Sequence, residues 1–316
     1  MFFERLRAMR RLVLSAIALM MLVGIGGCVD QAAPSGRLDK VWGRRGLSDG
    51  RFQTPRAIAI DKNDLLYVVD KVGHIQVFTA DGEYLRGWHT PAIENGKPCG
   101  MTIDDEGNLV VADTHYFRVL FYKPDGTLLE DRTIGGKNGQ GEGEFHFLTD
   151  VAQDSKGNYY VGEYGEHDRI QKFSHNGNFL LQWGGHGREP GKFVRPQGIT
   201  IDADDRIWVA DACNHRIQIF DEAGKLLKVW GEHGKEVGKL SYPYGIELDG
   251  KGHVYVCEFG NNRVQKFTIE GESLGYWGTS GRRDGELHQP WGLALDSQGR
   301  VHVVDTYNHR VQRIRL

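Results

Sequence analysis

Hydrophobic and polar residues alternate along most of the chain in short runs. Typical runs are IWVAD at 207–211 and RIQIF at 216–220, and their two-residue period predicts β-strands. Pairs that favour tight turns, such as Asp81-Gly82 and Asn176-Gly177, separate successive runs. No 3.6-residue apolar period follows the N-terminal segment, so we expect strands and no helices.

The runs belong to a unit that recurs six times. One copy reads PQGITID at 196–202, continues through RIWVAD to Asp211, and ends with NHRIQIF at Phe220. Its counterparts begin near residues 55, 98, 148, 243 and 290, and a spacing of 43 to 50 residues is typical of propellers. Four short strands in each of six units predict an all-β fold, a six-bladed β-propeller of four-stranded blades.

The two ends of the repeated region complete the same blade. The last unit stops at Leu316 after its third strand, and a matching fourth strand, LDKVWG, occurs at 38–43. Trp42-Gly43 repeats the pair that ends the fourth strand in three other units, where we expect the Trp to pack between blades. We therefore predict that the N-terminal strand closes the last blade and leaves no unpaired edge.

The repeated line resembles the NHL repeat family. The name-giving triplet occurs, once as a variant, at Asn214-His215-Arg216, Asn308-His309-Arg310 and Asn261-Asn262-Arg263. The resemblance spans residues 38–316 and implies a six-bladed propeller. The first unit departs with His74 in place of Arg, and the third has Glu166-His167-Asp168-Arg169 in place of the triplet. The family includes RNA-binding and protein-binding propellers and a zinc-dependent peptide-amidating lyase, so the resemblance does not fix an activity.

The N-terminal segment predicts a lipoprotein signal. A basic start with four arginines precedes a short apolar run and small residues, the pattern of a secretory signal, with an uncleaved anchor helix as the alternative. Ile25-Gly26-Gly27-Cys28 resembles the bacterial lipobox, in which the Cys is lipidated. We predict a signal peptide at 1–27, a lipidated Cys28 with a tether at 28–37, and the propeller at 38–316. The protein would then be anchored to a membrane of the cell envelope, on its extracytoplasmic side.

The net charge of the chain and its number of cysteines narrow the range of candidate functions. Removing residues 1–27 takes four arginines and Glu4 from 39 basic and 42 acidic residues, which leaves 35 against 41 and a net charge of −6. An acidic exported chain is a poor match for nucleic acid, so we expect no such partner, and we expect a monomer. Apart from Cys28, the chain has three cysteines, Cys99, Cys213 and Cys257. Their number is odd and their spacing is not that of metal ligands, so we predict free thiols.

Repeated polar residues have a structural interpretation. An acidic residue ends the second strand of each unit, and in four units an arginine follows five residues later; these pairs are Asp113 and Arg118, Asp211 and Arg216, Glu258 and Arg263, and Asp305 and Arg310. A carboxylate–guanidinium brace across the loop explains both sets. The loop histidines lie in equivalent loops of different blades, so we expect the ring to separate them; they are His115, His167, His215 and His309. We predict no metal or other cofactor, because zinc needs three or four ligands around one point. The sequence leaves open whether a divalent cation binds in the channel.

Residues that break the repeat are the candidates for function. The position after the repeat's first residue is predicted to face the channel mouth, and it holds Arg56, Cys99, Thr149, Gln197, Tyr244 and Trp291. Residues that follow the acidic position lie nearby and add Lys71, Phe259 and Tyr307. We predict a ligand-binding sector of aromatic rings beside two cations, made of Arg56, Lys71, Tyr244, Phe259, Trp291 and Tyr307. Packing of the rim is the alternative interpretation.

These observations favour a binding or scaffold propeller that acts through its top face. The predicted partner is a protein or a small ligand with an anionic and an aromatic part. In the amidating lyases, the resemblance implies zinc-binding histidines after the repeat's Pro, and none of the six residues there is His. No catalytic motif occurs in the chain. A propeller hydrolase or lyase with its active site at the channel mouth is the alternative.

Overall fold

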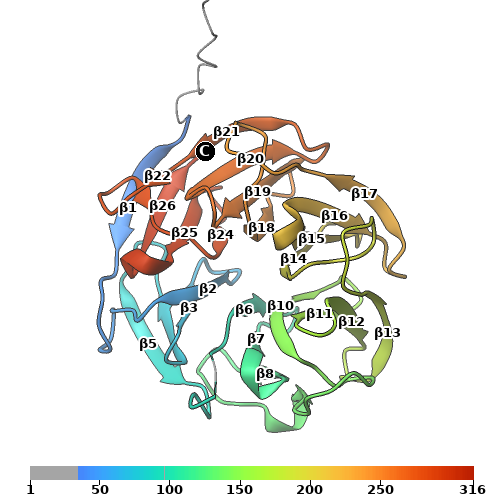
Figure 1. The fold of residues 1–316 in the computed structure, drawn as a ribbon. Coiled ribbons are helices and arrows are strands. Elements are labelled where there is room, and N and C mark those ends of the chain that lie inside the picture. Colours follow the sequence, from blue (N-terminus) through green and yellow to red (C-terminus); the bar gives the residue numbers. More distant parts are fainter. Residues whose placement is uncertain (1–34, 96) are drawn as a thin grey trace, which may run out of the picture. The chain divides into compact units, whose positions relative to one another are not determined.

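Six four-stranded antiparallel sheets surround a central axis in the computed structural model, which describes residues 35–95 and 97–316 (Figure 1). The predicted six-bladed propeller is therefore confirmed. The predicted signal peptide, Cys28 and most of the tether lie outside the described residues. Among the described residues, no helix has the length and apolar character needed to cross a membrane.

Each of the first three blades is built from strands that follow one another in the chain. The first blade contains β2 (Pro55–Ile60), β3 (Leu66–Asp70), β4 (His74–Phe78) and β5 (Tyr84–His89). The second contains β6 (Gly100–Ile103), β7 (Leu109–Asp113), β8 (Arg118–Tyr122) and the short β9 (Ile134–Gly135). The third contains β10 (Phe147–Gln153), β11 (Tyr159–Tyr164), β12 (Arg169–Phe173) and β13 (Phe179–Gly184).

The fourth and fifth blades follow the same order, and the sixth joins both ends of the repeated region. The fourth contains β14 (Pro196–Ile201), β15 (Ile207–Asp211), β16 (Arg216–Phe220) and β17 (Leu226–Trp230). The fifth contains β18 (Pro243–Leu248), β19 (His253–Glu258), β20 (Arg263–Thr268) and β21 (Ser273–Trp277). The sixth contains β24 (Leu293–Leu295), β25 (Val301–Asp305), β26 (Arg310–Arg315) and β1 (Arg37–Trp42). A separate two-stranded parallel pair is formed by β22 (Thr279–Ser280) and β23 (Glu286–Leu287).

The predicted closure of the ring is confirmed. β1 runs antiparallel to β26, with Leu38 opposite Ile314 and Trp42 opposite Val311. This pairing satisfies the outer edge of the last blade, which would otherwise present unpaired backbone groups. Because β1 ends where the linker to β2 begins, the start of β1 and the end of β26 lie on the face of the ring opposite that linker.

The tryptophans that end the outer strands pack between neighbouring blades, as predicted. The Trp42 ring of the sixth blade lies 4.5 Å from Phe78 of the first, and Trp183 of the third lies 5.7 Å from Phe220 of the fourth. The hairpin glycines of the next blade make room for these rings: a Cβ on Gly82 would lie 2.4 Å from the Trp42 ring. Burying such a side chain contributes roughly 1.5–3 kcal/mol to stability, so each interface between blades is held largely by apolar packing.

The predicted carboxylate–guanidinium braces are present. In the fourth blade, Arg216 Nε donates to Asp211 at 2.8 Å, and its other nitrogens donate to carbonyl oxygens of the linker. The third blade has its own brace from Arg169 to Glu163 at 2.5 Å. The first blade has no arginine at this position, and the Asp70 carboxylate instead accepts backbone N–H groups. These acids are therefore structural in all the blades.

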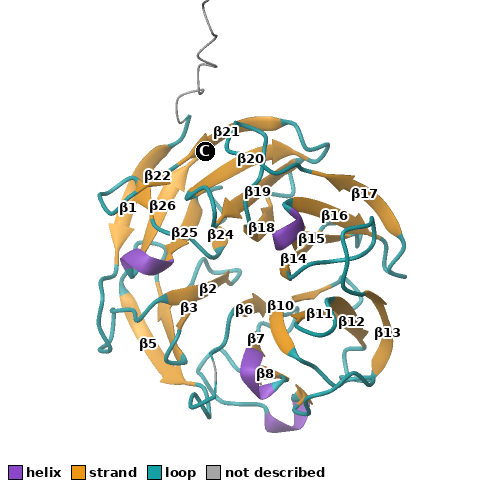
Figure 2. Ribbon diagram, in the orientation of Figure 1, coloured by secondary structure: helices purple, strands orange, loops and turns teal. Residues whose placement is uncertain are grey.

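Short 3-10 turns are present where the sequence predicted no helix. They are η1 (Thr114–Tyr116), η2 (Glu130–Arg132), η3 (Ala212–Asn214) and η4 (Thr306–Asn308), drawn in purple in Figure 2. Three of them connect the second and third strands of a blade and end at a residue in the left-handed conformation, such as His215 with φ 55°. Turns of three residues are too short to show a helical period in sequence, which is why the pattern missed them.

Candidate functional site

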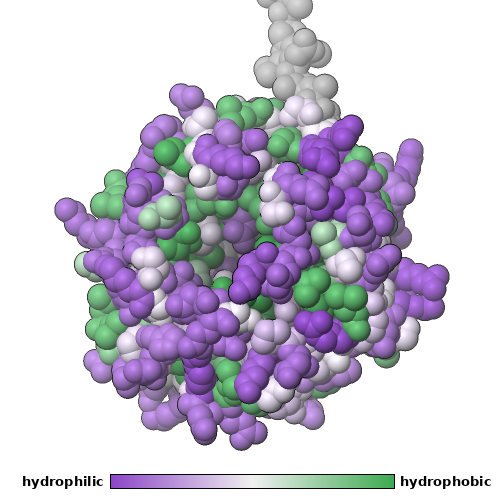
Figure 3. Space-filling model, turned by 180° about the vertical axis from the view of Figure 1, so that it is seen from behind, coloured by the Kyte–Doolittle hydropathy of each residue, from purple (hydrophilic) through white to green (hydrophobic). Residues whose placement is uncertain are grey.

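The innermost strands of all six blades line a central channel. The cavity there measures about 170 Å³, and every blade contributes residues to its wall. The space-filling view from the side opposite to Figure 1 shows a hollow at the centre of the ring, bordered by both hydrophobic and hydrophilic residues (Figure 3). The channel is therefore a place where residues from every blade can meet a single ligand.

Aromatic and cationic side chains form a continuous arc around one end of this channel. The Arg56 guanidinium lies 5.1 Å from the Trp291 ring, which lies 5.0 Å from Tyr244. Arg195 lies 5.3 Å from Tyr244 and 4.7 Å from Tyr164. Phe259 stacks on Tyr244 at 4.5 Å. We call this set the mouth cluster: Arg56, Tyr164, Arg195, Tyr244, Phe259 and Trp291.

The two guanidinium groups of the mouth cluster have no acidic partner among residues 35–95 and 97–316. No ion pair of Arg56 or Arg195 occurs there, and Arg195 Nε donates only to the Gln197 side chain, at 3.0 Å. The Nε atom of Arg56 and the indole Nε1 of Trp291 are buried and have no hydrogen-bond partner within the described ranges. Since partly buried arginines are usually paired, these donors are available to an anionic group.

The structure brings four of the six predicted sector residues into contact. Arg56, Tyr244, Phe259 and Trp291 belong to the mouth cluster, where Tyr244 is buried and the other three are half-buried. Tyr307 packs against His288 at 5.4 Å and is 45% exposed, so it lies on the rim. Lys71 directly follows β3, and its backbone N–H donates to the carbonyl oxygens of the linker.

Arg195 and Tyr164 belong to the mouth cluster but not to the predicted sector. Arg195 precedes the repeat's Pro, whereas the candidates were drawn from the position after the Pro and from the residues that follow the acidic position. Arg195 has φ 61°, and Thr54, Tyr242 and Gln289 share this left-handed conformation in their own blades. The conformation is costly for residues other than glycine, so its recurrence marks a fixed corner of the fold. The variable residue types at this corner were the available signal.

The remaining residues of the predicted mouth positions are buried in the channel wall. Cys99 Sγ lies 2.8 Å from Thr114 Oγ1 and donates to the Leu148 and Thr149 carbonyl oxygens. Burial raises the pKa of the Cys99 thiol to about 11, and the charges of Arg56 and Arg195 oppose this only in part. Cys99 is therefore a thiol rather than a thiolate at neutral pH. Cys99, Cys213 and Cys257 are free, as predicted.

Two carboxyl groups in the channel wall also break the repeat. Asp150 replaces the small residue found at its position in the other blades, and Glu247 stands where the other blades have Ala or Thr. Burial raises the pKa of Asp150 to about 7, although backbone N–H groups, including that of Ile199 at 2.9 Å, stabilise its charged form. Burial, and then the charge of Asp150, raise the pKa of Glu247 to about 8. Both groups therefore exchange protons near neutral pH.

The predicted loop histidines have different surroundings. His115 packs on Phe147, while His215 packs on His233 at 4.1 Å and its Nδ1 accepts the Tyr242 N–H. His309 Nδ1 accepts the Thr54 N–H at 3.0 Å. These three have separate partners, whereas His167 lies beside two further polar side chains that the sequence analysis did not connect with it.

Comparisons with known proteins agree with this architecture. The NHL repeat model matches residues 193–220, 240–267 and 287–314. NHL repeat-containing protein 3 of Mus musculus is 31% identical over 199 residues, 57% of this chain and 55% of that protein, so the chain spans about half the length of this relative. Peptidyl-glycine alpha-amidating monooxygenase B of Xenopus laevis is 35% identical over 126 residues, 37% of this chain and 14% of that protein. A solved streptogramin B lyase has the same fold, with TM-score 0.62, 13% identity, and coverage of 88% of this chain and 97% of its own.

Proposed function

We propose that this NHL-repeat propeller is a binding module whose channel mouth holds a ligand that combines an anionic group with a flat apolar part. The observation that carries the proposal is the mouth cluster, in which Arg56 and Arg195 lie against aromatic rings without an acidic partner among the described residues. A carboxylate or phosphate would accept hydrogen bonds from the guanidinium groups, and a planar group would stack beside Trp291.

The charge distribution supports an anionic ligand. The chain as a whole carries a net charge of −3, so two arginines without an acidic partner among the described residues make the channel mouth more positive than the rest of the chain. Half-buried guanidinium groups lose part of their hydration, and a bound anion would restore the missing interactions. Because water is partly excluded there, a charge-assisted hydrogen bond would contribute about 1.5–3 kcal/mol, more than on the open surface.

Peptide C-termini are a suitable first ligand class. The Xenopus laevis relative is named for peptidyl-glycine, and a peptide that ends in glycine presents a terminal carboxylate. An aromatic residue before that glycine would add the planar group that the rings of the mouth cluster can stack against. A protein partner could present the same chemistry through its own C-terminus.

The proposal is tested by binding of short peptides that end in Phe-Gly, measured by calorimetry. The free acid should bind, and the amidated peptide should bind about tenfold more weakly or worse, because its charge is gone. The double variant Arg56→Gln/Arg195→Gln should lose the preference for the acid. Arg283→Gln is the matched control, since its side chain is 90% exposed and outside the channel. Equal binding of acid and amide, or unchanged binding by the double variant, would refute the proposal.

An enzyme acting at the same mouth is the second candidate function. The observation that favours it is the pair Asp150 and Glu247, whose raised pKa values of about 7 and about 8 suit general acid–base catalysis. Turnover of a bound ligand that Glu247→Gln abolishes, with ligand affinity retained, would favour a hydrolase or lyase. Binding without turnover would favour the binding module.

Attachment to a membrane is a separate part of the proposal. Lipidation of Cys28 would anchor the propeller on the extracytoplasmic side of a bacterial membrane, with the face that carries Leu316 toward the lipid and the mouth cluster outward. Cys28→Ser should leave an unprocessed precursor without lipid, as measured by mass spectrometry of the purified chain. A variant that is still cleaved after Gly27 and still lipidated would refute this attachment.

A further inference from the structure

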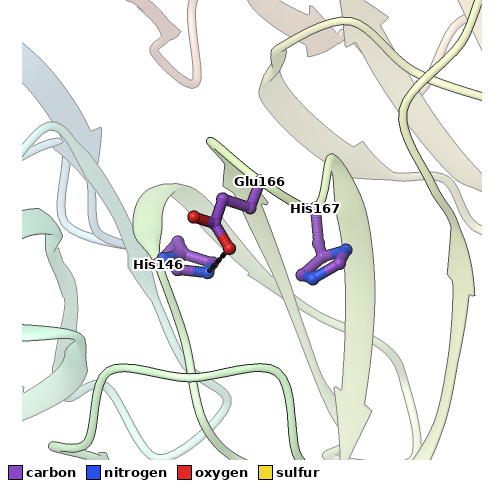
Figure 4. Close-up of side chains that lie close together, drawn as sticks. All are labelled: His146, Glu166 and His167. Carbon is purple, nitrogen blue, oxygen red and sulfur yellow. Dashed lines mark ion pairs between the residues drawn. The ribbon is translucent and has the colours of Figure 1, made fainter.

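Three side chains with metal-binding groups converge above the third blade. His146 belongs to the linker that precedes β10, and Glu166 and His167 belong to the loop between β11 and β12. One potential ligand atom from each lies within 4.8 Å of the other two. In the view of Figure 4, the Glu166 carboxylate lies between the two imidazole rings, with His146 Nε2 3.7 Å from Glu166 Oε2.

One nitrogen atom of each imidazole in this cluster is not used by the fold among the described residues. Nε2 of His146 and Nε2 of His167 are both buried, and neither has a hydrogen-bond partner in the described part of the chain. A buried polar atom without a partner costs about 1–3 kcal/mol, so two of them beside one carboxylate require an explanation. A positively charged ligand between them would satisfy both lone pairs and the carboxylate together.

The corresponding residues of other blades show that this arrangement is not required by the propeller. The residue two positions before the brace arginine is Asn214, Asn261 or Asn308 in the last three blades. Each of these amides donates to the repeated acid and to a linker carbonyl, as Asn214 does to Asp211 at 2.8 Å and to Gly187 at 3.0 Å. His167 occupies this position in the third blade and makes neither bond.

The loop of the third blade is also built differently. Its brace residues, Glu163 and Arg169, are six positions apart rather than five, so the loop has one extra residue. Gly165 has φ 129°, a conformation open to glycine, and it turns the chain just before Glu166. Gln140 Nε2 donates to Glu166 at 3.3 Å and orients the carboxylate from outside the cluster.

We propose that His146, Glu166 and His167 form a binding site for a zinc-class divalent ion. Two imidazoles and one carboxylate suit Zn²⁺ better than Ca²⁺ or Mg²⁺, which prefer oxygen ligands. Ligand atoms of a tetrahedral zinc site lie about 3.4 Å apart, given bonds of about 2.0–2.1 Å, and the three candidate atoms here lie within 4.8 Å of one another, so small side-chain movements would close the site. Three coordinating side chains leave the fourth coordination position of the ion for water or another bound molecule. This site lies outside the channel wall and shares no residue with the mouth cluster.

The test is calorimetric titration of Zn²⁺ into the full-length, chelator-treated chain purified in detergent. All proteins carry Cys213→Ser, because Cys213 is a half-buried thiol that could compete for zinc. We expect one ion per chain. His167→Asn and His146→Val install the residues of the fourth blade, so both should fold, and each should weaken binding by about tenfold or more. Zn²⁺ should also raise the melting temperature of the parent but not of His167→Asn.

His288→Val is the matched control. His288 holds the position of His146 in the sixth blade, where Asn308 takes the place of His167, so its loss should leave zinc affinity unchanged. Retention of parental affinity by His167→Asn would overturn the proposal. An equal loss in His288→Val, or no binding by the parent chain, would also overturn it.

Discussion

The third and fourth blades share a fold but use their top loops differently. In the fourth blade, Asn214, Arg216 and Gln218 all donate to the Asp211 carboxylate, so the polar groups of the loop are used by the structure. In the third blade, the longer loop and the linker before β10 each contribute a buried imidazole nitrogen that has no hydrogen-bond partner among the described residues. In these two loops, Asn214 follows the repeat and makes structural hydrogen bonds, whereas His167 breaks the repeat and leaves its Nε2 atom without a hydrogen-bond partner in the described chain.

The same contrast extends into the channel. A Cβ on Gly198 of the fourth blade would lie 2.3 Å from the Tyr244 carbonyl oxygen, so the inner strands of neighbouring blades can approach closely only because this residue is glycine. The third blade has Asp150 at the corresponding position, and its carboxylate accepts the Ile199 N–H of the next blade at 2.9 Å. The same position of the repeat therefore allows close packing of the inner strands where it is Gly198, and places a titratable carboxyl group in the channel wall where it is Asp150.

The largest effect is expected when a structural bond of the fourth blade is broken. Asp211→Ala removes the acceptor of four donors and leaves Arg216 largely buried without its carboxylate. Loss of one partner of a buried ion pair costs about 3–5 kcal/mol, so the free energy of unfolding should fall by that amount in urea titrations.

The surface pair of Lys228 and Glu270 provides the control for this prediction. Glu270 has 68% of its side chain exposed, and solvent screens the pair. Glu270→Ala should therefore leave the unfolding midpoint unchanged. A similar loss in both variants would show that the brace is no more important than a surface contact.

The channel carboxyls should produce a pH dependence of intermediate size. The pKa of Glu247 is raised from an ordinary value of 4.5 to about 8, so between these values the folded chain holds a proton that the unfolded chain has lost. Stability from this group is complete below about pH 4.5 and falls as the pH rises to about 8. Glu247→Gln should reduce the fall in unfolding free energy between pH 5 and pH 9 by roughly 1–3 kcal/mol.

Glu272→Gln is the matched control, because Glu272 is an exposed glutamate of the same blade region. It should leave the slope of stability against pH unchanged. If Glu247→Gln keeps the wild-type slope, the Glu247 carboxyl is ionised in the folded chain and the channel is more hydrated than its burial suggests.

The smallest expected effect on the free energy of unfolding compares the loops of the third and fourth blades directly. Asn214→Ala removes two hydrogen bonds in the fourth blade and should lower the free energy of unfolding by about 1–2 kcal/mol. His167→Ala in the metal-free chain removes no hydrogen bond of the ring nitrogen Nε2 and should cost about 0.5 kcal/mol or less. Equal losses in urea titrations of the two variants would mean that His167 is as structural as Asn214.

The sequence by itself determined the number of blades, the closing strand and the braces. Each follows from a periodic signal: the two-residue alternation, the 43 to 50 residue spacing, and the acid and arginine five positions apart. The same reasoning placed Arg56, Tyr244, Phe259 and Trp291 at one end of the channel, because equivalent positions in different blades lie at the same height along the propeller axis.

Only the tertiary structure decided which side chains meet. Arg195 joins the mouth cluster because the corner before Pro196 adopts a left-handed conformation, which residue spacing does not reveal. His146 meets His167 because the linker before β10 crosses the loop after β11, and 21 residues of sequence separate the two. Periodicity reports which backbone positions are equivalent, but contact between side chains on different elements depends on loop length and local φ angles, and these were settled by packing.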